Sequence, residues 1–239
     1  MNAELKDILF LDIETVGCTD QYNKLSERLK TQWARKVSAS FFKKEEGQTD
    51  GDLFHERAGI DAEFGKIVVI AVGIYAENEK GELILRTKYF ADHDEKKLLL
   101  DFRIMLEKMG SVVRLCAHNG KEFDFPYMCR RMLVNDLSLP LVLNMTGKKP
   151  WEVGHLDTME MWKFGDYKHY TSLDLLLAIF NIPSSKGVMD GSMVSKVYYQ
   201  EGDLKKIAEY CVGDVVAIAQ LYLKMKGLAI ISPTNIINA

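Results

Sequence analysis

Short runs of apolar and β-branched residues recur along the chain and predict the strands of a sheet. Between these runs, apolar residues repeat every three or four positions, the spacing that places them on one face of a helix. The predicted strands lie at residues 8–13, 66–75, 83–89, 112–117 and around 155–159. Strands interleaved with amphipathic helices predict an α/β protein in which helices cover a sheet.

The helices have recognisable ends. An amphipathic helix is predicted over residues 22–41, and three others are expected to begin at short polar side chains that can accept hydrogen bonds from a free helix start. These predicted N-caps are Asp92 or Asp94, Thr171 or Ser172, and Asp203, and a further helix carries Asp124 in its first turn. Gly227 is the predicted stop of the last helix. We expect a single domain over residues 1–239, with a helical insertion at about 16–65.

Two acidic residues lie in the first predicted strand. Asp12 and Glu14 are two positions apart in ILFLDIET, and the alternation of strand side chains places both on one face. Two carboxylates inside a protein lose hydration and repel each other, and a divalent cation relieves both costs. The pair therefore favours a metal site. The alternative is a pair of solvated acids at the end of a strand.

Two further segments carry acids that suit such a site. Asp124 in HNGKEFDFPYM follows a strand and a turn at Asn119. Tyr210 and Asp214 are four positions apart in YCVGDVVAI, so they are neighbours on one face of the last helix. Taken alone, each segment has a plainer interpretation, namely an acid that caps a helix and a core tyrosine beside a surface acid.

In this order, the three segments resemble the motifs of the DEDD 3′-5′ exonucleases, which read D-x-E, N-x-x-x-F-D and Y-x-x-x-D. The tyrosine of the third motif places the resemblance in the DEDDy branch, and the chain is most similar to the proofreading exonuclease domains of family-B DNA polymerases. The resemblance extends from Ile8 to about Leu223 and includes the linking stretch from KKPWEVGHLDT to LDLLLAIF. It implies a ribonuclease-H-like fold with a five-stranded mixed sheet and flanking helices.

The resemblance also implies a mechanism and roles for these residues. Two Mg2+ or Mn2+ ions would be held by four carboxylates, and Asp12 would contact both ions. Glu14 and Asp214 would complete the first ion's site, and Asp124 would hold the second through water. Tyr210 would orient the attacking water, since a tyrosine with an ordinary pKa is a poor base at neutral pH.

Substrate contacts are expected from three other residues. Asn119 and Phe123 belong to the second motif, and an aromatic ring can stack on any base; a core position is the alternative for Phe123. Thr15 could contact the terminal nucleotide or serve only as a turn residue. We expect His118 and Asp157 to be structural, because neither occupies a motif position.

Composition restricts the class of protein. The 239 residues carry a net charge of −3, and 47% of them are hydrophobic, as in ordinary globular domains. No apolar run reaches the length of a membrane span, and the four cysteines lack zinc-site spacing. We expect a cytoplasmic protein with reduced thiols. Since an enzyme acting at a chain end contacts few phosphates, the lack of a net positive charge does not count against it.

The segment between the first two strands is rich in basic residues. Between residues 24 and 44 it has one acid, Glu27, and seven basic residues: Lys24, Arg28, Lys30, Arg35, Lys36, Lys43 and Lys44. A solvated helix face is the plain interpretation, and guidance of nucleic acid is the functional one. The expected substrate is single-stranded nucleic acid, DNA favoured over RNA, with a replication or repair protein as a further partner. The alternatives are an exoribonuclease and, from another class, a non-catalytic binding module, which the intact acids disfavour.

Overall fold

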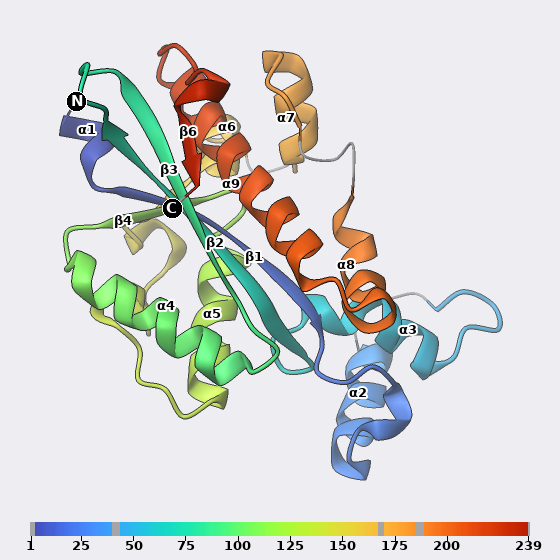
Figure 1. Ribbon diagram of the computed structural model, residues 1–239. Helices are drawn as coiled ribbons and strands as arrows, with labels where there is room; N and C mark the ends of the chain where they lie inside the picture. Colours follow the sequence, from blue (N-terminus) through green and yellow to red (C-terminus); the bar gives the residue numbers. More distant parts are fainter. Residues whose placement is uncertain (1–2, 40–43, 167–169, 185–188, 239) are drawn as a thin grey trace.

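A mixed β-sheet forms the centre of the computed structural model, which describes residues 3–39, 44–166, 170–184 and 189–238 (Figure 1). Within these residues the sheet has six strands in the order β5-β4-β1-β2-β3-β6. β1 pairs antiparallel with β2 and parallel with β4, so it lies in the interior of the sheet. The strands are β1 (Ile8–Gly17), β2 (Gly65–Glu77), β3 (Leu83–Ala91), β4 (Arg114–Ala117), β5 (Leu156–Asp157) and β6 (Ile236–Asn238). The predicted α/β class and mixed sheet are confirmed.

The predicted number of five strands is wrong, because a sixth strand closes the edge next to β3. β6 has three residues and pairs in parallel with β3 from Leu85 to Thr87. The segment is too short to show alternation, and Pro233 begins a turn directly before it. Its position depends on an available sheet edge, which the local sequence does not reveal.

Helices cover both faces of the sheet. In Figure 1, α9 crosses one face and α4 and α5 lie on the other, while α2 and α3 lie beyond the end of β1. The helices are α1 (Ala3–Lys6), α2 (Glu27–Ala39), α3 (Asp50–Arg57), α4 (Glu95–Met109), α5 (Asp124–Val134), α6 (Thr158–Lys163), α7 (Leu173–Phe180), α8 (Val194–Lys196) and α9 (Leu204–Met225). Among the described residues, none of these helices combines the length and apolarity needed to span a bilayer.

Short turns connect these helices and strands. The 3₁₀ turns are η1 (Tyr22–Lys24), η2 (Ala58–Ile60), η3 (Leu141–Leu143), η4 (Pro150–Glu152), η6 (Gly191–Met193) and η8 (Pro233–Asn235). A π-helical turn, η7 (Val197–Glu201), follows α8 directly. The region from η6 to η7 therefore forms one continuous helical segment in front of α9.

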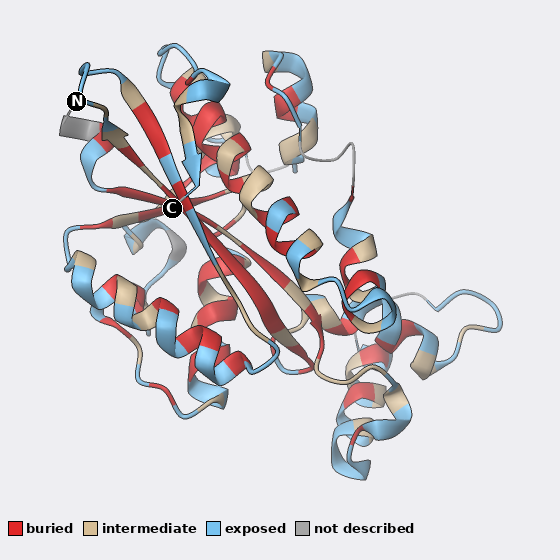
Figure 2. Ribbon diagram, viewed as in Figure 1, coloured by how far each residue is buried: buried red, intermediate tan, exposed pale blue. Residues whose placement is uncertain are grey.

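Alternation along β1 separates two hydrophobic cores. Ile8 and Phe10 pack on the α9 side, whereas Leu9, Leu11 and Ile13 pack on the side of α4 and α5. Both sets are almost entirely buried, and Figure 2 shows the buried colour along the middle of the sheet. The same alternation turns the even-numbered residues of β1, and so its two acids, toward α9.

Most predicted helix ends agree with the structure. Asp94, Ser172 and Asp203 accept backbone N–H hydrogen bonds at the starts of α4, α7 and α9. The continuous helix predicted over 22–41 is wrong, because the chain is extended at Leu25 and α2 begins after it. Ser26 explains the break, since its hydroxyl accepts the Leu29 N–H and starts a new helix. Phe41, the last apolar position of that prediction, lies outside the described residues.

Residues 18–64 contribute a small core of their own between β1 and β2. Trp33 of α2 is fully buried, and its ring packs edge-on against Phe54 of α3 and Phe64. The Trp33 indole N–H also donates to the Asp50 carbonyl oxygen at 3.0 Å. This packing fixes α2 and α3 beside the end of β1.

Candidate metal-binding and catalytic site

The first two acids lie near the end of an interior strand. Asp12 and Glu14 share the face of β1 that α9 covers, as the alternation predicts. Glu14 is only 8% exposed, and Asp12 is partly buried. The rigid strand therefore holds both carboxylates in the crevice between the sheet and α9.

Cys211 of α9 joins these acids. Its thiol lies 3.3 Å from Asp12 Oδ2 and 3.4 Å from the Asp12 carbonyl oxygen. Asp12, Glu14 and Cys211 each offer one possible metal-ligand atom, and these three atoms lie within 4.8 Å of one another. Cys211 is fully buried, and its contact with Asp12 was not predicted from the sequence. The sequence feature that could have indicated this contact is the position of Cys211 between Tyr210 and Asp214 on the same helix.

Charge repulsion shows that all three acidic segments converge. Burial raises the pKa of Asp12 well above its ordinary value, and repulsion from Glu14, Asp124 and Asp214 raises it further. Burial likewise raises the pKa of Glu14, with added repulsion from Asp214 and Asp124. The fold thus concentrates four carboxyl groups from β1, α5 and α9 in one crevice.

Asp124 enters the site from the first turn of α5. Its side chain is 3% exposed, and burial raises the pKa of its carboxyl to about 7. Hydrogen bonds from backbone N–H groups, including that of Ile13, oppose this rise. Asp124 thus lies against β1, although capping alone would have left it nearer the surface.

Tyr210 and Asp214 lie on the face of α9 that looks onto the acids. Tyr210 is 9% exposed, and its hydroxyl hydrogen-bonds to Asp214. Burial raises the pKa of Tyr210, and the negative charges of Asp214, Glu14 and Asp12 raise it further. The phenol therefore remains protonated at neutral pH and acts as a hydrogen-bond donor.

These residues fit a hard divalent cation. Carboxylate oxygens are the ligands that Mg2+ and Mn2+ prefer, and a cation would offset the repulsion that raises the pKa values of the buried acids. Asp12, Glu14, Asp124 and Asp214 are the residues that could hold it. Cys211 contributes a soft sulfur donor, but burial and the nearby acids keep its pKa raised, so the thiol stays neutral.

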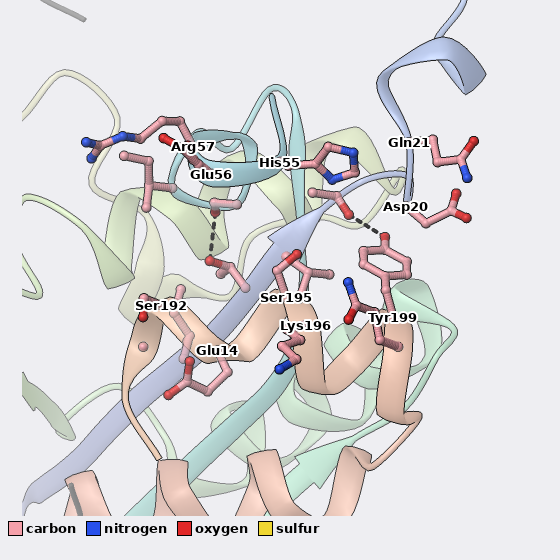
Figure 3. A pocket seen from close by; sticks show the side chains of 18 of the residues that line it. Glu14, Asp20, Gln21, His55, Glu56, Arg57, Ser192, Ser195, Lys196 and Tyr199 are labelled. Atoms are coloured by element: carbon pink, nitrogen blue, oxygen red, sulfur yellow. Dashed lines mark hydrogen bonds between the residues drawn. The ribbon is translucent and has the colours of Figure 1, made fainter. Parts of the chain in front are cut away.

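A groove adjoins the acidic cluster at the end of β1 and has a volume of about 1120 Å³ (Figure 3). We call it the β1 groove. Glu14 and Thr15 line it from the strand, together with Phe123 from the turn before α5. Thr15 lies within β1, so the alternative that it is a turn residue is wrong; its hydroxyl donates to the Gly59 carbonyl oxygen at 2.7 Å. The Phe123 ring lies 5.3 Å from that of Tyr127.

Asn119 does not line the β1 groove with the other two predicted substrate residues. It adopts a left-handed conformation, with φ of 65°, and its backbone N–H donates to Asp157. Its side-chain Oδ1 is buried and has no hydrogen-bond partner among the described residues. Asn119 thus lies beside Phe123, whose backbone N–H donates to the Asn119 carbonyl oxygen at 3.0 Å, but it does not share the groove lining with Thr15 and Phe123.

Asp157 and His118 have the structural roles predicted for them. The buried Asp157 carboxylate accepts N–H groups from Asn119 and Lys121 and also caps the start of α6. His118 lies within 2.9 Å of both the Thr158 hydroxyl and the Thr171 carbonyl oxygen. Together these contacts fix the turn that leads from β4 to Asp124.

The basic residues of α2 and its flanks are largely paired. Lys36 lies 2.6 Å from Asp61 and 3.5 Å from Glu63, and three other lysines also form ion pairs: Lys24, Lys30 and Lys44. Arg35 lies on a shallow surface beside Leu29, away from the β1 groove. Lys43 lies outside the described residues. The idea that this face guides nucleic acid therefore stays a prediction, and the β1 groove takes its walls from other residues.

Two comparisons place this geometry among known proteins. A family model described as a predicted 3′-5′ exonuclease related to the exonuclease domain of PolB matches residues 60–230. The structure of the family B DNA polymerase from the hyperthermophilic archaeon Pyrobaculum calidifontis matches with a TM-score of 0.56 and 17% sequence identity. That match covers 92% of this chain and 24% of the polymerase chain, so this chain spans about a quarter of the polymerase's length.

The structural match confirms the expected ribonuclease-H-like α/β fold. The family model covers far more than half of the sequence and spans α5 and α9, which carry Asp124, Tyr210 and Asp214. The protein therefore belongs to the family of predicted 3′-5′ exonucleases related to the exonuclease domain of PolB.

Proposed function

We propose that the protein is a metal-dependent 3′-5′ exonuclease of the DEDDy type that removes nucleotides from the 3′ end of single-stranded DNA. The observation that carries this proposal is the convergence of four carboxyl groups beside a groove. Two of these groups belong to β1, and α5 and α9 provide one each. Family membership supports the reaction, and the donor set supports the metal dependence.

Asp12, Glu14, Asp124 and Asp214 would hold two Mg2+ or Mn2+ ions. When bound, such a pair of ions stabilises the negative charge that develops on the attacking and leaving oxygens of a phosphodiester. The interior strand fixes Asp12 and Glu14, so little reorganisation is needed to form the site. The Cys211 thiol, 3.3 Å from Asp12 Oδ2, would restrain that carboxylate.

The remaining residues position the reactants. The protonated Tyr210 hydroxyl, held by Asp214, would orient the attacking water rather than remove its proton. Phe123 and Thr15 would contact the terminal nucleotide, since both line the β1 groove next to Glu14. Stacking on Phe123 would be tolerant of base identity, which suits successive removal of different nucleotides. Asn119 is proposed as a substrate contact on the motif resemblance alone, because its side-chain oxygen is buried and it does not line the groove.

The proposal extends to the compartment and the partners of the protein. Four free thiols are consistent with a reducing compartment, so we propose the cytoplasm. The likeness to part of a DNA polymerase favours DNA over RNA and suggests a replication or repair protein as a partner. The segment at about residues 16–65 would then be an insertion within one exonuclease domain.

A nuclease assay tests the proposal. Single-stranded DNA and RNA of one sequence, labelled at the 5′ end, are incubated with the protein in Mg2+, in Mn2+ and in EDTA. A ladder that shortens from the 3′ end only with metal supports the exonuclease. Faster shortening of RNA would assign the ribonuclease alternative, and binding without shortening would contradict catalysis.

A further inference from the structure

The β1 groove has two walls that come from distant parts of the chain. The first wall is formed by His55 and Arg57 of α3 with the following turn η2. Apart from Ile60, the last residue of η2, this wall precedes the residues that the family model matches. The second wall is formed by Ser195 and Lys196 of α8 with Tyr199 of η7. Figure 3 shows the labelled residues of α3 and of the α8 segment on opposite sides of β1.

Hydrogen bonds tie both walls to β1. The Gly59 carbonyl oxygen accepts from the hydroxyls of Thr15, at 2.7 Å, and Tyr127, at 2.8 Å. The Tyr199 hydroxyl donates to the Gly17 carbonyl oxygen from the other side. Because each wall is anchored to the strand that carries Asp12 and Glu14, the groove keeps a fixed position relative to the acids.

Each wall carries a basic residue that can contact a phosphate. Lys196 is exposed and makes no ion pair or hydrogen bond with the described residues, and Arg57 faces the groove from the other wall. Of the acids in the lining, Asp20 pairs with Lys24 at 2.7 Å, Glu56 accepts hydrogen bonds from the neutral amide of Gln48, and Glu14 belongs to the proposed metal site. The cations are therefore the groups best able to attract a phosphate.

The size of the groove limits what it can hold. Its volume of about 1120 Å³ slightly exceeds the range of about 300–1,000 Å³ found for pockets that bind small molecules. A few linked nucleotides match that size. Glu14 lies in the lining, so a strand whose 3′ end reaches the acids continues along the groove toward its 5′ end.

We infer that the β1 groove binds the nucleotides directly 5′ of the cleaved bond as a single strand, with Lys196 and Arg57 contacting phosphates from opposite walls. This inference rests on the proposed exonuclease function and adds to it the path of the substrate. It assigns the α3 wall, most of which lies outside the family match, to substrate binding.

The first test measures the salt dependence of binding. Fluorescence anisotropy follows a labelled twelve-nucleotide DNA strand in Mg2+, with Asp12→Asn in every protein to suppress cleavage. Lys196→Met removes the charge but keeps an apolar stem. Lys205→Met is the matched control, because Lys205 is also exposed and does not line the groove.

A lost phosphate contact lowers the slope of log affinity against log salt by about 0.7 for a single strand. We expect this change and an affinity loss of up to about fivefold for Lys196→Met, but not for Lys205→Met. Equal affinities and slopes for the two variants, with unchanged melting temperatures, would overturn the inference.

The second test varies the length of the substrate without the Asp12 substitution. A dinucleotide is too short to extend along the groove, so Lys196→Met should lower kcat/KM by about fivefold on the twelve-nucleotide strand and by less on the dinucleotide. An equal loss on both substrates would place Lys196 at the cleaved nucleotide and contradict the proposed path. If the unsubstituted protein shortens neither substrate, the exonuclease proposal itself fails.

Discussion

Replacing Asp124 by Asn should stabilise the metal-free protein at neutral pH, because the native fold holds this carboxyl in a site that opposes its ionisation. Burial raises its pKa from 3.8 to about 7. The native state therefore binds more protons than the unfolded state between these values, and the free energy of unfolding falls as the pH rises through that window. At about 1.4 kcal/mol per pKa unit, the loss approaches about 4 kcal/mol above pH 7.

The assay is urea unfolding in EDTA at several pH values. The stability of the unsubstituted protein should fall between about pH 4 and pH 7 relative to that of Asp124→Asn, which cannot ionise at this position. Adding Mg2+ at neutral pH should recover the loss in the unsubstituted protein more than in the variant, because a bound cation offsets the repulsion. Parallel stability curves in EDTA, or no difference in the response to Mg2+, would refute the reasoning.

Two further predictions concern catalysis and the scaffold. Asp12→Asn should abolish metal-dependent shortening of labelled DNA, whereas Tyr210→Phe should lower kcat by about tenfold, the effect of one hydrogen bond; complete loss in both would contradict the role given to Tyr210. Arg131→Met should lower the free energy of unfolding by about 3–5 kcal/mol in urea titrations, because it leaves Glu95 charged and buried without its ion-pair partner. Arg130→Met, at the exposed neighbouring position, should change the free energy of unfolding by less than about 0.5 kcal/mol. Similar losses in the two variants would contradict the stabilising role given to the buried pair.

Local sequence patterns were sufficient for the elements whose boundaries are set by nearby residues. The alternation in ILFLDIET placed Asp12 and Glu14 on one face, and Asp203 marked the start of α9. The same patterns did not reveal the break before α2, because the hydroxyl of Ser26 competes with the longer apolar repeat around it.

Contacts between distant segments could not be predicted in this way. The thiol of Cys211 meets Asp12 across 199 residues, and β6 depends on the edge that β3 offers. The β1 groove likewise combines α3 with α8, and neither segment has a pattern that names its partner. The motif resemblance predicted that the acids share one site, but the groove walls beside that site could be identified only from the structure.

Anomalous diffraction from crystals soaked in Mn2+ tests the central claim most directly. Two strong peaks within coordinating distance of Asp12, with Glu14, Asp124 and Asp214 around them, are the predicted result. Well-ordered crystals in which these carboxylates bind no Mn2+, at concentrations that support nuclease assays, would contradict the account.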